Sequence, residues 1–161
     1  MSLDKTPMTP AVRVLKEAGV AFTEHPYHYV EHGGTATFAR DFGIYEHMVI
    51  KTLVMEDDAK RPFVVLMHGD REVSTREMAR TLGVKTVRPC TPETAQRHSG
   101  YIIGGTSPFG LRKPMPVYVE ETILALPKIY INGGKRGFLV GLDPKDLARV
   151  LGPTPVRVAI P

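Results

Sequence analysis

Short apolar runs, separated by glycine, proline and acidic residues, account for most of the chain. These runs are rich in Val, Ile, Leu and aromatic side chains, which is the composition of strands. Strands are predicted at residues 20–25, 48–55, 62–67, 84–88, 101–103, 117–119, 128–132, 138–142 and 156–160. Several of them follow one another with only a turn between, which is typical of antiparallel neighbours.

Helices are predicted where a capping side chain precedes an amphipathic segment and a glycine follows it. Three of the helices start with a capping residue followed directly by proline, a good first helical residue. A fourth starts with a capping box, Ser74 with Glu77. The predicted helices are residues 9–18, 35–42, 74–82, 91–97 and 143–151.

The order of these elements favours an α+β fold. Strands come in runs, and a regular alternation of strand and helix is missing, so a doubly wound parallel sheet is disfavoured. We expect a mixed, largely antiparallel sheet that curls towards a barrel, with short helices packed around it. At 161 residues, the chain 1–161 is expected to form one domain.

Composition narrows the class of protein only a little. No apolar run approaches the length of a membrane span, and the first residues lack the layout of a signal peptide. A single cysteine, Cys90, excludes an internal disulfide framework, so a cytoplasmic location is expected. The net charge of +4 suits a polyanionic partner such as RNA, although many basic proteins bind no nucleic acid.

Lys51 is the first candidate for chemistry, because it lies in the middle of an apolar predicted strand. On pattern alone, a solvent-facing lysine that guards a sheet edge is the better interpretation. The functional alternative is a lysine that holds a phosphate or polarises an ester carbonyl.

Two glycine loops are the second candidate. Residues 104–108 (Gly-Gly-Thr-Ser-Pro) could form a plain turn or present backbone N–H groups as an oxyanion hole. Ser107 is a poor nucleophile candidate, since Phe109 stands where a nucleophile elbow requires glycine. Residues 133–137 (Gly-Gly-Lys-Arg-Gly) combine flexible backbone with two cations, so they suit an anion, but they do not match a P-loop.

A metal site is not expected. His25, His28 and His32 do not have the spacing of a zinc motif, and Cys90 has no identifiable histidine partner. We interpret the histidines as loop residues and Cys90 as a buried or incidental thiol. No metal and no cofactor are predicted.

Taken together and in order, these motifs resemble the YbaK/ProX family of aminoacyl-tRNA deacylases, which is similar to the editing domain of bacterial prolyl-tRNA synthetases. The resemblance covers nearly the whole chain. It rests on residues 50–53 (Ile-Lys-Thr-Leu), 96–108 with their glycine loop, and 130–137 (Tyr-Ile-Asn-Gly-Gly-Lys-Arg-Gly). The start of the chain, residues 10–15 with Phe22, His25 and Tyr27, looks most like the YbaK branch, which removes cysteine from tRNA(Pro).

The resemblance implies catalytic roles for Lys51, Gly104 and Gly105. The substrate-binding residues that it implies are Tyr27, Thr106, Ser107, Pro108, Asn132, Gly133, Gly134, Lys135 and Arg136. Asn132 is a departure, because the YbaK branch often carries serine there. The expected partner is the 3′ aminoacyl end of tRNA, with prolyl-tRNA synthetase in a transient complex. Removal of alanine instead of cysteine, and a binding module without catalysis, are the alternatives.

Overall fold

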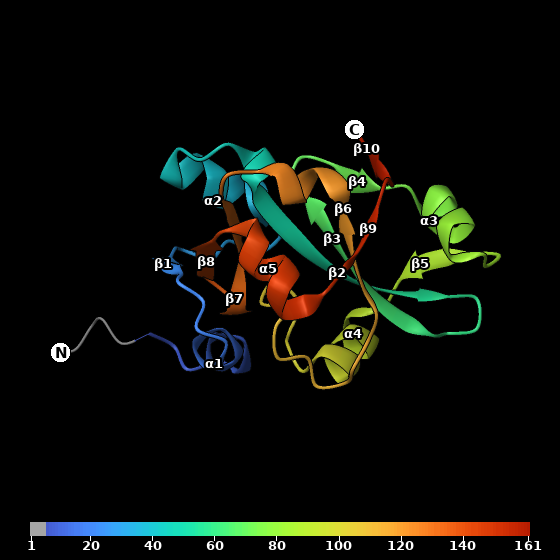
Figure 1. The fold of residues 1–161 in the computed structure, drawn as a ribbon, viewed down its shortest axis with the longest axis horizontal. Helices are drawn as coiled ribbons and strands as arrows, with labels where there is room; N and C mark the ends of the chain where they lie inside the picture. The colour runs from blue at the N-terminus through green and yellow to red at the C-terminus, as the bar shows by residue number, and fades with distance from the viewer. Residues whose placement is uncertain (1–5) are drawn as a thin grey trace.

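A mixed eight-stranded sheet organises the fold of residues 6–161, which the computed structural model describes (Figure 1). The strands of this sheet are β1 (Thr23–Pro26), β2 (Val49–Asp57), β3 (Pro62–His68), β5 (Val87–Pro89), β6 (Val117–Glu120), β7 (Ile129–Lys135), β8 (Phe138–Leu142) and β9 (Thr154–Val156). Strands β4 (Glu72–Val73) and β10 (Ala159–Ile160) form a separate antiparallel pair. The helices are α1 (Pro10–Glu17), α2 (Gly34–Phe42), α3 (Thr75–Leu82), α4 (Pro92–Ser99) and α5 (Pro144–Leu151), with 3₁₀ turns η1 (Glu46–Met48) and η2 (Glu121–Ala125).

The sheet is open and has the strand order β1-β8-β7-β2-β3-β6-β9, with β5 pairing on β2. Four of its seven pairings are antiparallel, and β2·β7, β3·β6 and β6·β9 are parallel. Strands β1 and β9 form the two ends of the order, so the curl does not close into a barrel. The predicted α+β class with a mixed, largely antiparallel sheet is confirmed.

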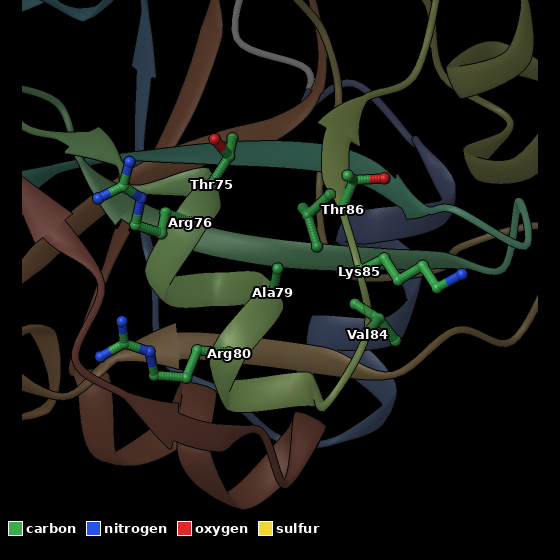
Figure 2. Close-up of a pocket in the computed structure, with 8 residues that line it drawn as sticks. Thr75, Arg76, Ala79, Arg80, Val84, Lys85 and Thr86 are labelled. Atoms are coloured by element: carbon green, nitrogen blue, oxygen red, sulfur yellow. The ribbon is translucent and has the colours of Figure 1, made fainter.

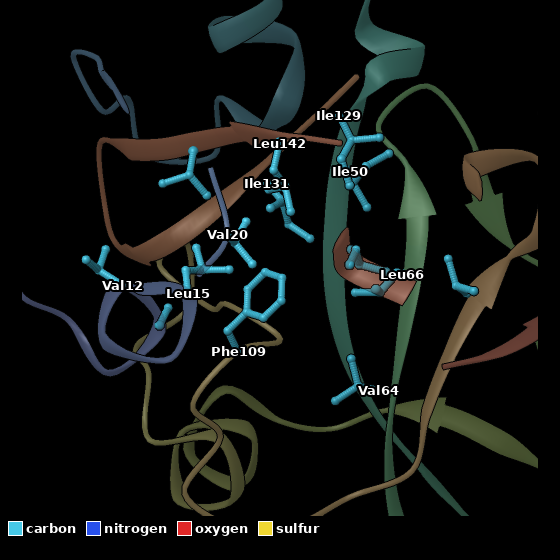
Figure 3. Close-up of a cluster of buried hydrophobic side chains, with 14 of the residues drawn as sticks. Val12, Leu15, Val20, Ile50, Val64, Leu66, Phe109, Ile129, Ile131 and Leu142 are labelled. Carbon is cyan, nitrogen blue, oxygen red and sulfur yellow. The ribbon is translucent and has the colours of Figure 1, made fainter. Parts of the chain in front are cut away.

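The first face of the sheet carries the largest apolar cluster (Figure 3). Val54, Val64 and Ile131 point to this face from three adjacent strands, and helices α1 and α5 cover it with Leu15 and Leu147. Burial of such side chains is the main favourable term in folding.

The second face carries two separate apolar clusters. One forms around Phe38 of α2 with Val49 and Leu139. The other forms around Met78 of α3 with Met55 and others from β2, β3 and β5. Successive residues of a strand point to opposite faces, so Val49, Lys51, Leu53 and Met55 all face this side. Lys51 therefore lies between the two clusters.

Helix ends follow the signals in the sequence. The side chains of Thr9, Ser74, Thr91 and Asp143 each accept a hydrogen bond from a backbone N–H in the first turn. Gly43, Gly83 and Gly152 end their helices in the left-handed conformation. In residues 6–161, the five predicted helices are confirmed to within two residues at each end.

The predicted strand at 101–103 is wrong. Gly100 turns the chain with φ +84°, and the Tyr101 hydroxyl donates to the Phe109 carbonyl oxygen at 2.6 Å. The run therefore forms one side of a folded loop, with Tyr101 buried and Ile102 and Ile103 exposed. A three-residue apolar run carries too little periodicity to distinguish these states. The other strand predictions hold with shifted ends, and the predicted strand at 156–160 divides into β9 and β10.

Phe109 anchors this loop, because its side chain is fully buried in the first-face cluster. We expect Phe109→Ala to lower the free energy of unfolding by about 3–5 kcal/mol through the cavity it leaves. Chemical denaturation measures this change. Ile103→Ala, at an exposed position of the same loop, is the matched control and should change it by no more than about 0.5 kcal/mol. Equal losses in the two variants would contradict this assignment of the anchor.

Candidate active site

Lys51 is largely buried on the second face, where 20% of its side chain is exposed. Its Nζ donates to the Arg71 carbonyl oxygen at 2.5 Å and to Glu72 Oε2 at 3.1 Å. Lys51 is therefore held in place and is not a freely solvated lysine at a sheet edge. A lysine ammonium has three donors, so one remains for a further acceptor.

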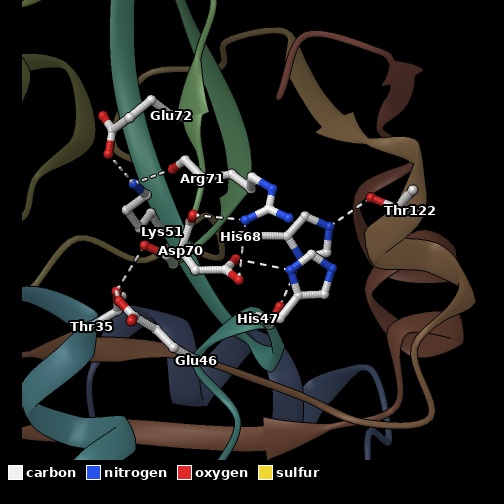
Figure 4. A network of polar contacts seen from close by, with 10 residues as sticks. Thr35, Glu46, His47, Lys51, His68, Asp70, Arg71, Glu72 and Thr122 are labelled. Atoms are coloured by element: carbon white, nitrogen blue, oxygen red, sulfur yellow. Dashed lines mark hydrogen bonds and ion pairs between the residues drawn. The ribbon is translucent and has the colours of Figure 1, made fainter. Parts of the chain in front are cut away.

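The turn between β3 and β4, residues 68–72, holds Lys51 and is itself fixed by a polar network (Figure 4). The Gly69 N–H donates to the Val49 carbonyl oxygen at 2.6 Å, and His47 Nδ1 lies 2.8 Å from Asp70 Oδ1. His68 stacks on His47 with their ring centroids 3.6 Å apart. These contacts fix the position of the Arg71 carbonyl that binds Lys51.

His68 is buried in this network with both ring nitrogens in hydrogen bonds, and the neutral imidazole suits them. Its Nδ1 lies 2.7 Å from the His47 carbonyl oxygen, and its Nε2 lies 2.6 Å from Thr122 Oγ1. The carbonyl requires a donor at Nδ1, so Nε2 accepts from the hydroxyl. Burial lowers the pKa of His68, which agrees with this neutral form.

Asn132 and Lys51 occupy equivalent places on neighbouring strands. Strands β2 and β7 pair through Val49 with Tyr130 and Ile50 with Ile131, and the pairing ends there. Lys51 and Asn132 are the next residues on the two strands, and both face the second side of the sheet. The site therefore begins where this parallel pair separates.

The two glycine loops are bound to each other. Asn132 Nδ2 donates to the Gly104 carbonyl oxygen at 3.0 Å, and Arg136 Nε donates to the Ile103 carbonyl oxygen at 2.9 Å. Asn132 Oδ1 accepts from the Gly134 N–H at 2.6 Å, so the same side chain also shapes its own loop. The structure thus joins residues 104–108 and 132–136 around Asn132.

Only one of the two predicted oxyanion donors is free. The Gly105 N–H donates to the Ile102 carbonyl oxygen at 2.9 Å, so it is already used inside the loop. The Gly104 N–H has no acceptor among residues 6–161, and Gly104 is exposed with φ +86°. Gly104 therefore keeps a backbone N–H that is free to bind an oxyanion, whereas the Gly105 N–H stabilises the turn.

Ser107 and Pro108 lie on the buried side of the loop. Both are buried, and Ser107 Oγ accepts from the Phe109 N–H at 3.1 Å. Neither side chain is exposed for the predicted contact with substrate. Thr106 Oγ1 donates to the Ile102 carbonyl oxygen at 3.4 Å, while the side chains of Lys135 and Arg136 reach the surface.

Tyr27 and Tyr29 lie on the side of the glycine loops nearest α2. Tyr27 is half-buried, with its ring 5.3 Å from that of Phe38, and burial raises the pKa of its hydroxyl. Tyr29 was not predicted as a site residue. A Cβ added at Gly104 would lie 2.6 Å from the Tyr29 hydroxyl, and the Arg136 guanidinium lies 5.0 Å from its ring centre. Its spacing of two from Tyr27 in an extended segment was the available signal.

Thr52 is a second residue that sequence reasoning missed. In the described part of the chain, its Oγ1 is the buried side-chain oxygen that lacks a hydrogen-bond partner. Such groups are rare in folded proteins, because losing the bonds to water costs free energy. Thr52 directly follows Lys51, so this unpaired hydroxyl lies on the opposite face of the same strand.

The remaining candidates contribute packing. The His25 ring contacts the rings of Phe38, Phe42 and Tyr130 edge-on. Burial of the Cys90 thiol, together with the nearby Glu56 carboxylate, raises the pKa of that thiol to about 11.

Within residues 6–161, no group of three or more His, Cys, Asp or Glu side chains is placed to hold a metal ion. Over the same residues, no helix has the length and apolar character of a membrane span.

Comparison with known proteins identifies the class of this site. The family described as "Aminoacyl-tRNA editing domain" matches residues 33–150, which contain Lys51 and both glycine loops. The chain belongs to the aminoacyl-tRNA editing family. The resemblance seen in the motifs is thereby confirmed, and the chain is an aminoacyl-tRNA deacylase.

Individual relatives of the chain are consistent with membership of this family. The chain is 30% identical, over 86% of its length and 85% of the other protein, to the Enterococcus faecalis protein named "Putative Cys-tRNA(Pro)/Cys-tRNA(Cys) deacylase EbsC". It is 27% identical to a proline–tRNA ligase of Nitratidesulfovibrio vulgaris, over 65% of this chain and 16% of that one. A solved structure described as "a putative trans-editing enzyme for prolyl tRNA synthetase" superposes with a TM-score of 0.81 at 24% identity, over 98% of this chain and all of that one. This last likeness shows the fold.

Gly104 offers a direct test of the loop. We expect Gly104→Ala to reduce deacylation at least about tenfold, because the added methyl group meets the Tyr29 hydroxyl and moves the free N–H. Gly83→Ala is the matched control. Gly83 also has a positive φ, +71°, but nothing lies within 4 Å of its added Cβ. Deacylation rates at equal folded fraction separate the two, and equal rates would exclude Gly104 from the site.

Proposed function

We propose that this deacylase removes cysteine from mischarged tRNA(Pro) by cleaving the 3′ aminoacyl ester. The observation that carries the proposal is the held Lys51 ammonium, with one donor left, on the strand that pairs with β7, whose Asn132 binds the Gly104 loop. The name of the Enterococcus faecalis relative supports cysteine as the amino acid.

An aminoacyl ester is already activated, so the reaction requires no nucleophile from the protein. It gains from placement of the ester, a positive charge near the developing negative charge, and N–H donors for the oxyanion. In this proposal, Lys51 holds the terminal phosphate or the ester carbonyl, and the Gly104 N–H binds the oxyanion. The exposed cations Lys135 and Arg136 steer the RNA end to the loop.

The attacking group is either water or the thiol of the cysteinyl substrate itself. In the second case the thiol sulfur attacks the ester carbonyl carbon, and a small cyclic thiolactone forms. The C–O bond to the ribose breaks, and the thiol proton passes to the ribose oxygen that leaves. Both routes use the same placement of the carbonyl, so the same residues serve either one.

Alanine is the alternative amino acid, since alanyl and cysteinyl groups differ by one sulfur atom. Discrimination on such a difference in an apolar site amounts to about 1–3 kcal/mol. Faster removal of alanine would keep the deacylase chemistry and change the assigned substrate.

Lys51→Ala is the decisive variant. We expect it to lower the rate of Cys-tRNA(Pro) deacylation by about 10²–10³-fold, the usual effect of losing one group that stabilises the transition state. The measurement compares loss of cysteine and of alanine from tRNA(Pro) by the wild-type and variant proteins. Lys128→Ala serves as a control that removes a lysine outside the site.

Circular dichroism and thermal unfolding should show that Lys51→Ala remains folded. Turnover near the wild-type rate in a folded variant would reject the mechanism. No loss of either amino acid with folded wild-type protein would instead favour a binding module that senses the aminoacyl end without catalysis.

A transient complex with prolyl-tRNA synthetase belongs to the same proposal. The fold of residues 6–161 is accounted for by the editing sheet and its covering helices, with no appended RNA-reading module. We expect the chain alone to deacylate Cys-tRNA(Pro) and Cys-tRNA(Cys) at rates within about tenfold, and added synthetase to increase the preference for tRNA(Pro). A strong preference by the chain alone would show that selectivity does not depend on the synthetase.

A further inference from the structure

A basic hollow of about 440 Å³ lies outside the candidate site, between α3 and β5 (Figure 2). No acidic residue belongs to its lining, which consists of Thr75, Arg76, Ala79, Arg80, Val84, Lys85, Thr86 and Val87. Figure 2 shows Arg76 and Arg80 extending from the helix on one side and Lys85 from the segment before β5 on the other.

Two of these three cations are free of ion pairs. Among residues 6–161, no carboxylate lies within 4.0 Å of the side-chain nitrogens of Arg76 or Lys85. Arg80 contacts Glu77 at 3.6 Å with 73% of its side chain exposed, and such a pair is weak. The nearby Asp58 carboxyl is already bound to the Lys85 and Thr86 N–H groups. The three cations therefore outnumber the two nearby carboxylates, Glu77 and Asp58, and Arg76 and Lys85 are left without an ion pair.

The hollow lies on the same face of the sheet as Lys51. Its residues Ala79 and Val87 pack in the cluster of Met55 and Met67, and Met67 is the cross-strand partner of Lys51. Lys51 and Met55 are four residues apart on one strand, a separation of roughly 13 Å at about 3.3 Å per residue. Helix α3 covers the sheet between the two places, so a tRNA whose 3′ end reaches Lys51 would have to pass over the outside of α3 to reach the hollow.

We infer that the hollow binds the phosphate backbone of the tRNA behind its 3′ end, an inference that rests on the proposed function for the identity of the RNA. Spaced, long cationic side chains on opposite sides of an open hollow can bind successive phosphates without reading bases. Thr75 and Thr86 add hydroxyl groups that can donate to phosphate oxygens. This surface supplies affinity for any tRNA, and an acidic protein surface is the competing occupant that the experiment tests.

The test compares two variants that each remove two positive charges. Arg76→Ala/Lys85→Ala empties the hollow of its unpaired cations, whereas Arg13→Ala/Lys16→Ala removes two exposed cations of α1, the helix on the first face. All four side chains are exposed and lie outside the catalytic site. Thermal unfolding checks that both variants fold as the wild type does.

For the hollow variant we expect KM on full-length aminoacyl-tRNA to rise about five- to tenfold with kcat unchanged. Its KM on an aminoacylated 3′-terminal adenosine, too short to reach the hollow, should not change. The dependence of uncharged tRNA affinity on salt should also weaken, by about 0.7–0.9 in the log–log slope for each phosphate that the variant no longer neutralises. The α1 variant should show none of these effects.

Several outcomes would overturn the inference. Equal losses in the two variants would mean that net charge alone matters. A raised KM on the short substrate would mean that the substitutions disturb the active site. Unchanged tRNA binding together with weaker binding of prolyl-tRNA synthetase would assign the hollow to a protein.

One further outcome separates this inference from the proposed function. If the wild type shows no deacylation of any aminoacyl-tRNA, while the salt effect on tRNA binding is observed, the proposed function is rejected and the RNA-binding surface is supported.

Discussion

The holding of the Lys51 ammonium is the interaction on which the rest of the site depends. A mostly buried cation is costly unless hydrogen-bonded acceptors surround it, and here the Arg71 carbonyl and Glu72 fill that role. Those acceptors exist because the turn after β3 is fixed by His47, His68 and the backbone of Gly69. The polar network is therefore as much a part of the site as the lysine itself.

The second glycine loop leaves the strand next to that of Lys51 because of how the sheet is built. Parallel pairing of β2 with β7 ends after Ile50 and Ile131, so Lys51 and Asn132 are the first residues beyond the pairing on the two strands. The Asn132 amide then ties its loop to Gly104, and Phe109 anchors that loop in the core of the opposite face. Packing on one face thus positions chemistry on the other.

Local signals made the helices and most strands predictable, since caps such as Thr9 and Asp143 act within a few residues. The candidate residues Lys51 and Gly104 were identified from the order of the motifs along the chain, which says nothing of how these residues are arranged in space. Long-range hydrogen bonding was not accessible: nothing local shows that the Gly105 N–H is occupied, that Ser107 is buried, or that Tyr29 touches Gly104. The strand prediction at 101–103 was wrong for the same reason, because the conformation of these residues depends on the hydrogen bond between Tyr101 and Phe109.

The open sheet ends in two short strands that each contain a proline, Pro26 in β1 and Pro155 in β9. Proline has no N–H to offer a neighbouring strand, and a strand of three or four residues gives an incoming chain little to pair with. An unclosed sheet would otherwise be a template for strand addition between molecules. Both ends of the strand order are thus poor sites for strand addition between molecules.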